Sequence, residues 1–336
     1  MPNVLLTCGG HWVGIVLQLK QAMQSVPALR TGALHVADRA RITPAGCYAD
    51  AAFRVPDVAD PLYVDRLLAI CTEHRIRVVV PHLDIDLDRL VPFLDRFADI
   101  GTTVVCPSAD MVNLCRDKLG FDAFARSEDL PCPRSYPADS LRADFFPLFA
   151  KRRRSSASVG ACHCPTLDAA RSALERYPDL IFQEVLRGEE VTVDAFVSQR
   201  GDCTIRVPRV RDKVVGGEAM QSHTIRSAPL TGVADRTIAA LARRGFRGPL
   251  NLQFFLGETV TLVEVNARLG SASVLANVAT RGRYYSSVLL EACGGVSEGD
   301  PDDYEEGVSL YRYWGEMYHN DASPLAFVPP RRKDEG

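Results

Sequence analysis

The chain has 336 residues, of which 46% are apolar and 24% charged, and its formal net charge is −3. A chain of this length can bury a core divided among two or three subdomains, and the composition excludes disordered and collagen-like proteins. The small negative charge gives no reason to expect a nucleic-acid partner. No apolar run is long enough to span a bilayer, so no membrane partner is expected.

The start of the sequence lacks a basic segment, so we expect no signal peptide. Ten cysteines are scattered through the predicted strands and helices, as is usual where thiols stay reduced and buried. We therefore expect a cytoplasmic protein.

The first third of the chain alternates strands with helices. Strands are predicted at residues 4–6, 33–37, 76–80 and 103–106, with helices at 13–23, at 62–74 and after residue 87. This alternation is typical of a parallel sheet with helices on both faces. The loop at residues 8–14 departs from G-x-G-x-x-G, and no suitably placed acidic residue follows it, so a dinucleotide site is not favoured.

Asp84 and Asp86 follow the strand at residues 76–80. Open α/β sheets place their ligands at this end of a strand, so Asp84 could contact a substrate. Alternatively, both carboxylates are simply favoured by the dipole at a helix N-terminus. The sequence leaves both interpretations open.

Beyond residue 108 the pattern changes, and one long helix is predicted over residues 109–126. The prolines at 131 and 133 follow its end. Further strands are predicted at 146–150, 180–185, 190–198 and 203–210, and further helices at 167–177, 233–244, 272–280 and 284–293. The aromatic residues Tyr311, Trp314 and Tyr318 near the C-terminus could wall a pocket, but most of them are expected to pack in the core.

Lys151 ends a predicted strand, and a loop rich in serine with a glycine at position 160 follows it. Backbone N–H groups and hydroxyls in such a loop can bind phosphate, to which a lysine adds a point charge. The P-loop spacing is absent. Residues 151–154 are all cationic, and such a run can also be a solvated patch.

Residues 251–266 predict a β-hairpin with a turn at Gly257-Glu258. With a two-residue turn, Gln253 lies opposite Leu262, and alternation places Leu262, Glu264 and Asn266 on one face. Gln253, Glu264 and Asn266 then offer oxygen ligands of the kind that Mg²⁺ prefers. A strand end whose polar groups only touch solvent is an equally consistent interpretation.

In their order along the chain, these motifs resemble the ATP-grasp ligases, above all the large subunit of carbamoyl-phosphate synthetase and the amino-acid ligases built like it. The likeness covers residues 108–293 by motif and the first domain by architecture. It is carried by RDK at 116–118, K and S.S.G at 151–160, FQEVLRGEEVTVD at 182–194, NLQFF at 251–255 and TLVEVNARLGSASVLANVAT at 261–280. One departure is Arg152, where the family usually has proline.

The resemblance implies an ATP-grasp fold in which two α+β lobes enclose ATP. A Rossmann-like pre-ATP-grasp domain would span residues 1–108, a small lobe with the phosphate loop and adenine hinge 109–190, and a C-terminal lobe with the metal site 191–330. The implied cofactors are ATP and Mg²⁺, as two ions, with Mn²⁺ as an alternative. A homodimer is also implied, because similar enzymes commonly form one.

The resemblance also assigns roles to residues. Gln253, Glu264 and Asn266 would hold the metal, and Arg268 and Lys151 would act on the transferred phosphate. The nucleotide would be bound by Lys118, Lys151, Ser155, Ser156, Ser158, Gly160, Glu184, Val185, Leu186 and Glu190, with Glu189 as an alternative to Glu190 on the ribose. Without the resemblance, Lys118 is a helix-surface lysine, and Glu184 and Glu190 are surface charges at a strand turn.

After Arg268, carbamoyl-phosphate synthetases have another arginine in a segment SRSS, where this chain has Gly270 and Ser271. We therefore expect a carboxylic acid rather than bicarbonate as the acceptor. Arginines and a lysine at positions 206–213 would line an anionic-substrate pocket or form a solvated strand face. The expected substrate contacts are Asp84, Arg211, Glu218, Arg268, Gly270 and Ser271.

The function implied by this resemblance is ATP-dependent ligation of a small-molecule carboxylic acid to an amine, both of them amino acids. An acyl phosphate would be the intermediate, with ADP and phosphate as products. One alternative is a non-catalytic ATP-binding sensor or partner protein with the same fold. A nicotinamide-dependent oxidoreductase is a second alternative, which the missing fingerprint weakens.

Overall fold

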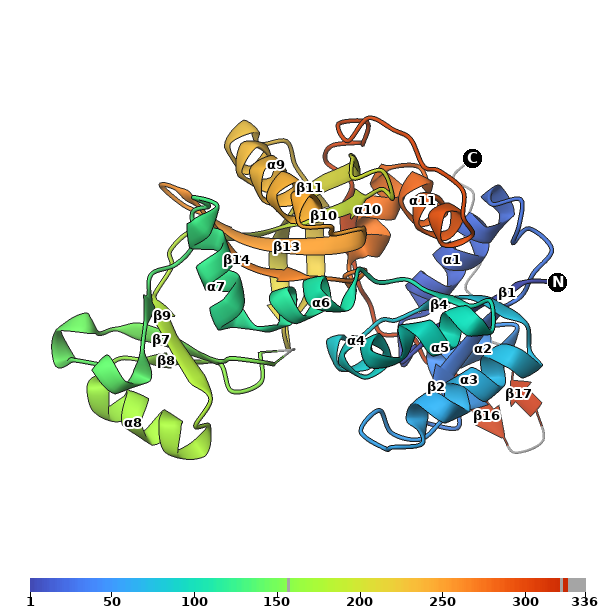
Figure 1. Ribbon diagram of the computed structural model, residues 1–336, viewed down its shortest axis with the longest axis horizontal. Helices are drawn as coiled ribbons and strands as arrows, with labels where there is room; N and C mark the ends of the chain where they lie inside the picture. Colours follow the sequence, from blue (N-terminus) through green and yellow to red (C-terminus); the bar gives the residue numbers. More distant parts are fainter. Residues whose placement is uncertain (156–157, 321–322, 326–336) are drawn as a thin grey trace, which may run out of the picture.

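The computed structural model describes residues 1–155, 158–320 and 323–325. Figure 1 shows the parallel sheet of β1, β2 and β4 at one end, the antiparallel sheet with β10, β11, β13 and β14 in the middle, and the small sheet of β7, β8 and β9 at the other end. A two-stranded sheet of β16 (Tyr318–Asn320) and β17 (Ser323–Leu325) lies near the C-terminus.

The N-terminal sheet has the strand order β3-β2-β1-β4-β5, and its strands are parallel. Val4 and Leu6 pack in one core with α1, and Leu5 packs in another with α3 and α5, which confirms helices on both faces. The sequence did not predict α2 and β3, which have only five and four residues. The elements are β1 (Asn3–Thr7), α1 (Val13–Ser25), β2 (Leu34–Asp38), α2 (Pro44–Tyr48), β3 (Ala51–Arg54), α3 (Tyr63–Glu73), β4 (Ile76–Val80), α4 (Asp84–Leu90), the 3₁₀ turn Val91–Phe93, α5 (Leu94–Asp99) and β5 (Thr103–Val104).

The six-stranded sheet has the order β14-β13-β10-β11-β12-β15, and its strands are antiparallel. Its apolar face packs against α9 and against α6 and α7 in a single core. The elements of this unit are α6 (Ala109–Arg116), α7 (Lys118–Ser127), β10 (Glu189–Val197), β11 (Cys203–Val215), β12 (Glu218–Thr224), α9 (Ala228–Arg243), β13 (Gly248–Leu256), β14 (Val260–Asn266) and β15 (Ser309–Tyr311).

The single helix predicted over residues 109–126 is wrong, because the chain breaks at Asp117. This residue has extended backbone angles, and its carboxylate accepts hydrogen bonds from the N–H groups of Leu119 and Gly120. It is therefore the N-cap of α7 and satisfies donors that a helix start leaves unpaired. Lys118 becomes the first residue of α7 instead of a mid-helix residue.

The small sheet has the order β6-β9-β7-β8 and packs against α8. It reaches the end of the molecule farthest from the N-terminal sheet in Figure 1. Its elements are β6 (Ser135–Tyr136), the 3₁₀ turns Ala138–Ser140 and Ala143–Phe145, β7 (Leu148–Arg152), β8 (Cys162–Cys164), α8 (Leu167–Arg176) and β9 (Leu180–Glu184).

The β13–β14 hairpin differs from its expected register. Its loop spans residues 257–259, and the pairing shifts beside Gln253, which lies directly opposite Glu264. This bulge makes Val263 an extra residue and reverses the alternation of the strand. Leu262 is therefore buried in the core, while Glu264 lines a cavity. The predicted pairing of Gln253 with Leu262, and the shared face of Leu262 and Glu264, are wrong.

Two late helices complete the N-terminal unit. The helices α10 (Ser273–Ala279) and α11 (Arg283–Ala292) pack beside α1 (Figure 1), and one apolar core contains residues of all three. The Asn277 amide donates a hydrogen bond of 2.9 Å to Gln18 in α1. The N-terminal sheet and the six-stranded sheet are thus joined through a shared core.

The C-terminal aromatic residues contradict one expectation. Tyr311 is 69% exposed and Trp314 is 92% exposed, so these two do not pack in the core. The side chain of Tyr318 is not among those that the structure describes. All ten cysteines are free thiols. Within the described residues, no helix combines the length and the apolar character needed to cross a bilayer.

Candidate active site

A cavity of about 400 Å³ lies between the small sheet and the six-stranded sheet. Strands β7 and β9 form one wall, strands β10, β11, β13 and β14 the other, and the start of α7 closes it. Apolar walls with a few polar groups are usual for small-molecule sites. The residues expected from the sequence that line it are Lys118, Lys151, Ser155, Ser158, Glu184, Val185, Leu186, Glu190, Arg211, Gln253 and Glu264.

Two lysines place positive charge in this cavity. Lys151 on β7 is only 6% exposed, and burial lowers its pKa to about 8, although the charge of Glu264 acts in the opposite direction. The Lys118 ammonium lies 4.0 Å from a Glu264 carboxylate oxygen and donates to the Ser155 carbonyl at 3.2 Å. Burial also lowers the pKa of Lys118. Both cations are poorly solvated and suited to an anionic ligand.

The proposed metal ligands lie on neighbouring strands. Gln253 on β13 is directly opposite Glu264 on β14, and the Asn266 amide donates to Glu264 at 3.4 Å. Within the described residues, no group of three His, Cys, Asp or Glu side chains could hold a metal. The set therefore has one carboxylate with amide oxygens beside it. It fits Mg²⁺, which takes one or two carboxylates and fills its remaining positions with water and phosphate oxygens.

The chain after β9 offers a free backbone edge. Glu184 is held by Arg134, whose N–H donates to the Glu184 carboxylate at 2.8 Å and whose carbonyl accepts from the Glu184 N–H at 3.0 Å. Val185 and Leu186 make no backbone hydrogen bond to another described residue. These two residues border the cavity, so their N–H and C=O groups are available to a ligand with a donor and an acceptor on one edge.

Glu190 and Arg211 form an ion pair at the rim of the cavity. Their atoms lie 2.9 Å apart, and the Arg211 guanidinium also donates to the Gly217 carbonyl at 2.7 Å. The other cations of residues 206–213 do not lie at the rim of the cavity. Arg206 is paired with Asp235 and Asp302, Arg209 is paired with the buried Asp194 at 2.7 Å, and Lys213 is exposed. The stretch is therefore neither a uniform pocket lining nor a solvated face.

Arg268 and Asp84 lie outside the cavity and contact each other. The Arg268 guanidinium donates to both oxygens of Asp84, at 2.8 and 2.6 Å, and to the Leu269 carbonyl at 3.1 Å. Asp84 is 2% exposed. Burial would raise its pKa, but the charge and hydrogen bonds of Arg268 lower it below the usual value. This pair links the start of α4 to the segment after β14.

Five other expected residues also lie away from the cavity wall, and one of them is the proposed metal ligand Asn266. Gly160 has a φ of 76°, in the left-handed region that suits glycine. Gly270 lies against a buried network, since a Cβ there would be 2.9 Å from the Asn251 amide nitrogen. The Ser271 carbonyl accepts from Arg312 at 2.6 Å, and Glu218 lies 3.8 Å from Arg312. The expected nucleotide contact Ser156 lies outside the described residues.

Two polar contacts were not anticipated from the sequence. Asp38 ends β2, and its carboxylate accepts from the Gly10 N–H of the glycine loop at 3.0 Å. Its second oxygen accepts from the Ala40 N–H, which leaves the side chain engaged within the protein. Arg116 donates to both oxygens of Asp88 and to the Ser155 carbonyl. In the sequence, the only local indication of a role for Arg116 was its position beside the aspartate of the RDK motif.

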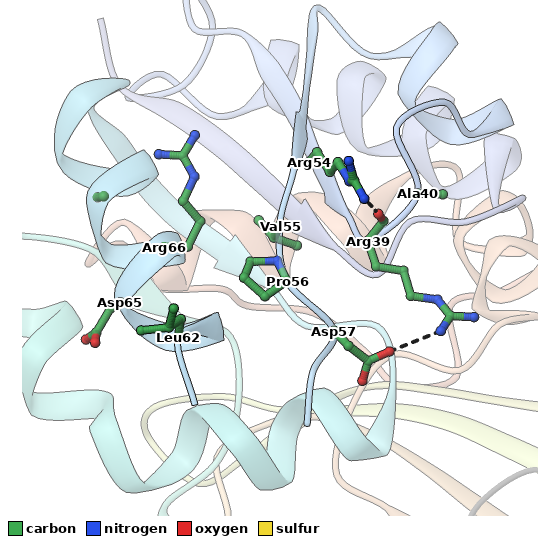
Figure 2. A pocket seen from close by; sticks show the side chains of 10 residues that line it. Arg39, Ala40, Arg54, Val55, Pro56, Asp57, Leu62, Asp65 and Arg66 are labelled. Atoms are coloured by element: carbon green, nitrogen blue, oxygen red, sulfur yellow. Dashed lines mark hydrogen bonds and ion pairs between the residues drawn. The ribbon is translucent and has the colours of Figure 1, made fainter. Parts of the chain in front are cut away.

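A second, larger cavity of about 950 Å³ lies on the N-terminal unit. Figure 2 shows Arg39, Arg54 and Arg66 around it, with Arg39 paired to Asp57 at 3.1 Å. It is a wide surface groove beside β3 and α3, and none of the residues expected to bind ligand lines it. Size alone therefore does not identify the site, and the smaller cavity contains the concentration of buried charge.

Two family models match the chain. Residues 4–105 match one described as PylC-like, N-terminal domain, and residues 176–308 match one described as ATP-grasp in the biosynthetic pathway with Ter operon. No curated protein matches the sequence.

Several solved structures share the fold. A biotin carboxylase–beta-gamma-ATP complex from Campylobacter jejuni has a TM-score of 0.72 at 12% identity, over 91% of this chain and 74% of that chain. The biotin carboxylase domain dimer of Hydrogenobacter thermophilus 2-oxoglutarate carboxylase, in complex with MgADP, ADP and bicarbonate, has a TM-score of 0.73 at 13% identity, over 92% and 73%. The L-amino acid ligase from Bacillus licheniformis has a TM-score of 0.67 at 14% identity, over 89% and 75%. Identities this low establish a common fold, and the fold class expected from the sequence is confirmed.

Proposed function

The chain belongs to the ATP-grasp superfamily and has a PylC-like N-terminal domain, and we propose that it is an ADP-forming ligase that joins a small-molecule carboxylic acid to an amine. One observation carries the proposal. The buried Lys151 and the half-buried Lys118 share a cavity with the carboxylate of Glu264 and the amide of Gln253. This is the combination of charges that a nucleoside triphosphate with its magnesium ions requires.

The same cavity offers a place for each part of ATP. The free backbone edge at Val185 and Leu186 suits adenine, and the Glu190 carboxylate suits a ribose diol. Lys118 and Lys151 would bind the phosphates as point charges. Gln253, Glu264 and Asn266 would hold Mg²⁺, which when bound neutralises charge on the phosphate oxygens.

The chemistry proposed for Arg268 uses its remaining donors. An arginine has five N–H groups, and three of them are engaged by Asp84 and Leu269. The other two can bind oxygens of the transferred phosphate. A substrate carboxylate attacks the γ-phosphorus, and the bond to the β–γ bridging oxygen breaks to release ADP. The amine nitrogen then attacks the acyl carbon, phosphate leaves, and the nitrogen loses a proton to give the amide.

The test is ADP formation by the purified protein with MgATP and a matrix of amino acids, singly and in pairs. We expect release that depends on one pair and is abolished in Glu264→Gln. Glu258→Gln is the matched control, because Glu258 is an exposed residue in the loop of the same hairpin. It should retain the activity of the unmodified protein.

Two outcomes would contradict the proposal. ATP binding without release in any pair would favour a non-catalytic nucleotide-binding protein. Release that depends on bicarbonate, with no amine incorporated into a product, would indicate a carboxylation step instead of amide formation. Mass spectrometry of the reaction mixture distinguishes the amide from other products.

A further inference from the structure

The strand order of the N-terminal sheet defines a crevice. In the order β3-β2-β1-β4-β5, the chain moves outward from β1 in one direction and from β4 in the other. Open α/β sheets bind ligands at such a reversal, outside the carboxyl ends of the two strands. The loops that follow β1 and β4 contain His11, Trp12 and His82.

Side chains from the six-stranded unit meet these loops. The Arg312 guanidinium, just after β15, lies over the Trp12 ring at 4.8 Å from its centroid. Its Nη2 donates to the Ser271 carbonyl at 2.6 Å. Glu218, the first residue of β12, lies 3.8 Å from Arg312 Nη1 and 3.8 Å from His11 Nε2. Four segments far apart in the sequence therefore converge here.

One donor at this junction has no hydrogen-bond partner in the described part of the chain. Arg312 Nη1 is buried and makes no hydrogen bond to any described residue, and its distance to Glu218 exceeds hydrogen-bond length. A buried donor left unpaired is costly, more so when the group is charged. Arg209 Nη1 is unpaired in the same way, and burial together with the charge of Arg209 lowers the pKa of Arg312. These unpaired N–H donors of two guanidinium groups favour an anionic ligand.

The wall of the junction is uncharged. His82 is 2% exposed, and its ring lies 5.2 Å from that of Trp12. Burial and the charges of Arg268 and Arg312 lower the pKa of His82 to about 3, so its imidazole is neutral at physiological pH. One of these two arginines, Arg268, also pairs with Asp84 and is among the phosphate-transfer residues proposed above.

We propose that Trp12, Glu218 and Arg312 form the subsite of the nitrogen-donating substrate, and that this substrate is a zwitterionic α-amino acid. Arg312 would bind its carboxylate and Glu218 its ammonium. In an α-amino acid, the nitrogen and the nearer carboxylate oxygen are about 2.5–3 Å apart. Both can therefore bind at once to a donor and an acceptor that lie 3.8 Å from each other. The inference rests on the proposed function, because it names the amine.

Tryptophan fluorescence tests the subsite without catalysis. The chain has two tryptophans, Trp12 and the exposed Trp314, so Trp12 alone reports in a Trp314→Phe background. The probes are the twenty common L-amino acids, with and without MgADP. Each one that responds is compared with the amine that lacks its carboxylate and the acid that lacks its amine; for L-alanine these are ethylamine and propionate. We expect saturable changes with the amino acid and not with either analogue.

Variants assign the two ends of the ligand. Arg312→Met and Glu218→Gln should each raise the Kd at least about tenfold, the loss typical of a charge-assisted hydrogen bond. Because Arg312 lies on the reporting ring, its variant is measured by calorimetry. Arg281→Met is the matched control, since Arg281 is exposed and pairs with Asp303 and Glu305 away from this junction.

The outcomes separate this inference from the proposed function. If no amino acid binds while MgADP still binds, or if ethylamine binds as tightly as alanine, the subsite is wrong. If pairs of amino acids support ADP formation with an unchanged KM in Arg312→Met, the subsite is wrong and the ligase stands. If amino acids bind at Trp12 but no pair yields ADP, the subsite stands and the ligase is wrong.

Discussion

Lys151 is a charged residue with almost no contact with solvent, and that position determines its chemistry. Burial lowers its pKa to about 8, more than two units below the usual value of 10.5, even with Glu264 nearby. The lysine therefore changes charge within a pH range that enzymes experience. Its position near the end of β7 was evident from the sequence, but the lowered pKa depends on how deeply the surrounding structure buries it.

This titration predicts a pH-dependent affinity for MgADP. In the proposed function protonated Lys151 would bind phosphate, so the affinity should be constant below about pH 8 and fall up to tenfold per pH unit above it. Lys151→Arg stays protonated and should give a weaker but flat profile. Calorimetry between pH 7 and 9.5 measures both, with Lys20→Arg, an exposed lysine paired with Asp50, as the control. An equal slope in Lys151→Arg would contradict the assignment.

Asp86 predicts a second pH effect, on stability. It is fully buried between the hydroxyls of Thr7 and Tyr63, and burial raises its pKa from 3.8 to about 6. Between pH 4 and 6 the folded protein thus keeps a proton that the unfolded chain releases. The contribution of Asp86 to the free energy of unfolding is full below about pH 4. It falls by on the order of 2–3 kcal/mol as the pH rises to 6.

Urea unfolding from pH 4 to 7 checks this contribution. Asp86→Asn keeps the shape of the side chain but cannot ionise. As the pH rises, the free energy of unfolding of the variant should therefore increase relative to that of the unmodified protein. A difference that does not vary with pH would show that Asp86 is already ionised when folded.

At the scale of elements, local sequence patterns predicted most of the longer strands and helices to within a few residues. Besides missing short elements such as α2 and β3, they failed at two irregularities. Asp117 lies between two stretches of helical pattern without any proline or glycine to mark the break. Its capping role depends on the N–H groups of Leu119 and Gly120. Its carboxylate also pairs with Arg153, which is 36 residues away in the sequence. The bulge at Val263 likewise has no local signal, because regular alternation was an adequate description of the strand.

The N-cap at Asp117 gives a prediction about α7. Asp117→Ala removes the cap and the contact with Arg153, and it should lower the free energy of unfolding by about 1–2 kcal/mol. It should also weaken MgADP binding, because Lys118 is the next residue. Asp168→Ala is the control, since Asp168 in the first turn of α8 is 90% exposed, and it should change stability by less than about 0.5 kcal/mol. Urea unfolding and calorimetry measure the two effects.

At the scale of the molecule, the site depends on contacts that no sequence pattern contains. The resemblance placed Lys118, Lys151 and Glu264 together because their motifs have a recognisable order. The pairing of Asp84 with Arg268 joins residues 184 positions apart. Asp84 was expected to contact a substrate or to lie at a helix start. Its position at the start of α4 agrees with the second interpretation, and its bond to Arg268 could not be anticipated from either.

The ion pair of Asp84 with Arg268 leads to a prediction about the stability of the protein. Asp84→Asn leaves the half-buried Arg268 without its counter-charge and should lower the free energy of unfolding by about 3 kcal/mol. Arg268→Met in the same chain should recover part of that loss, because no uncompensated charge remains. Urea unfolding followed by fluorescence and circular dichroism measures both variants. Equal stability of the single and double variants would mean that Arg268 gains nothing from Asp84.

The packing of α10 and α11 on α1 has a consequence for synthesis of the chain. The helix α1 ends at Ser25, and the residues that cover it begin at Ser273. At about 5–20 residues per second, roughly 10–50 s separate the translation of these two segments. During that time the apolar surface of α1 that α10 and α11 cover in the finished structure lacks these partners. The ribosome-bound chain can therefore aggregate through this surface until the late helices are made. Molecular chaperones have a defined surface to bind during this interval.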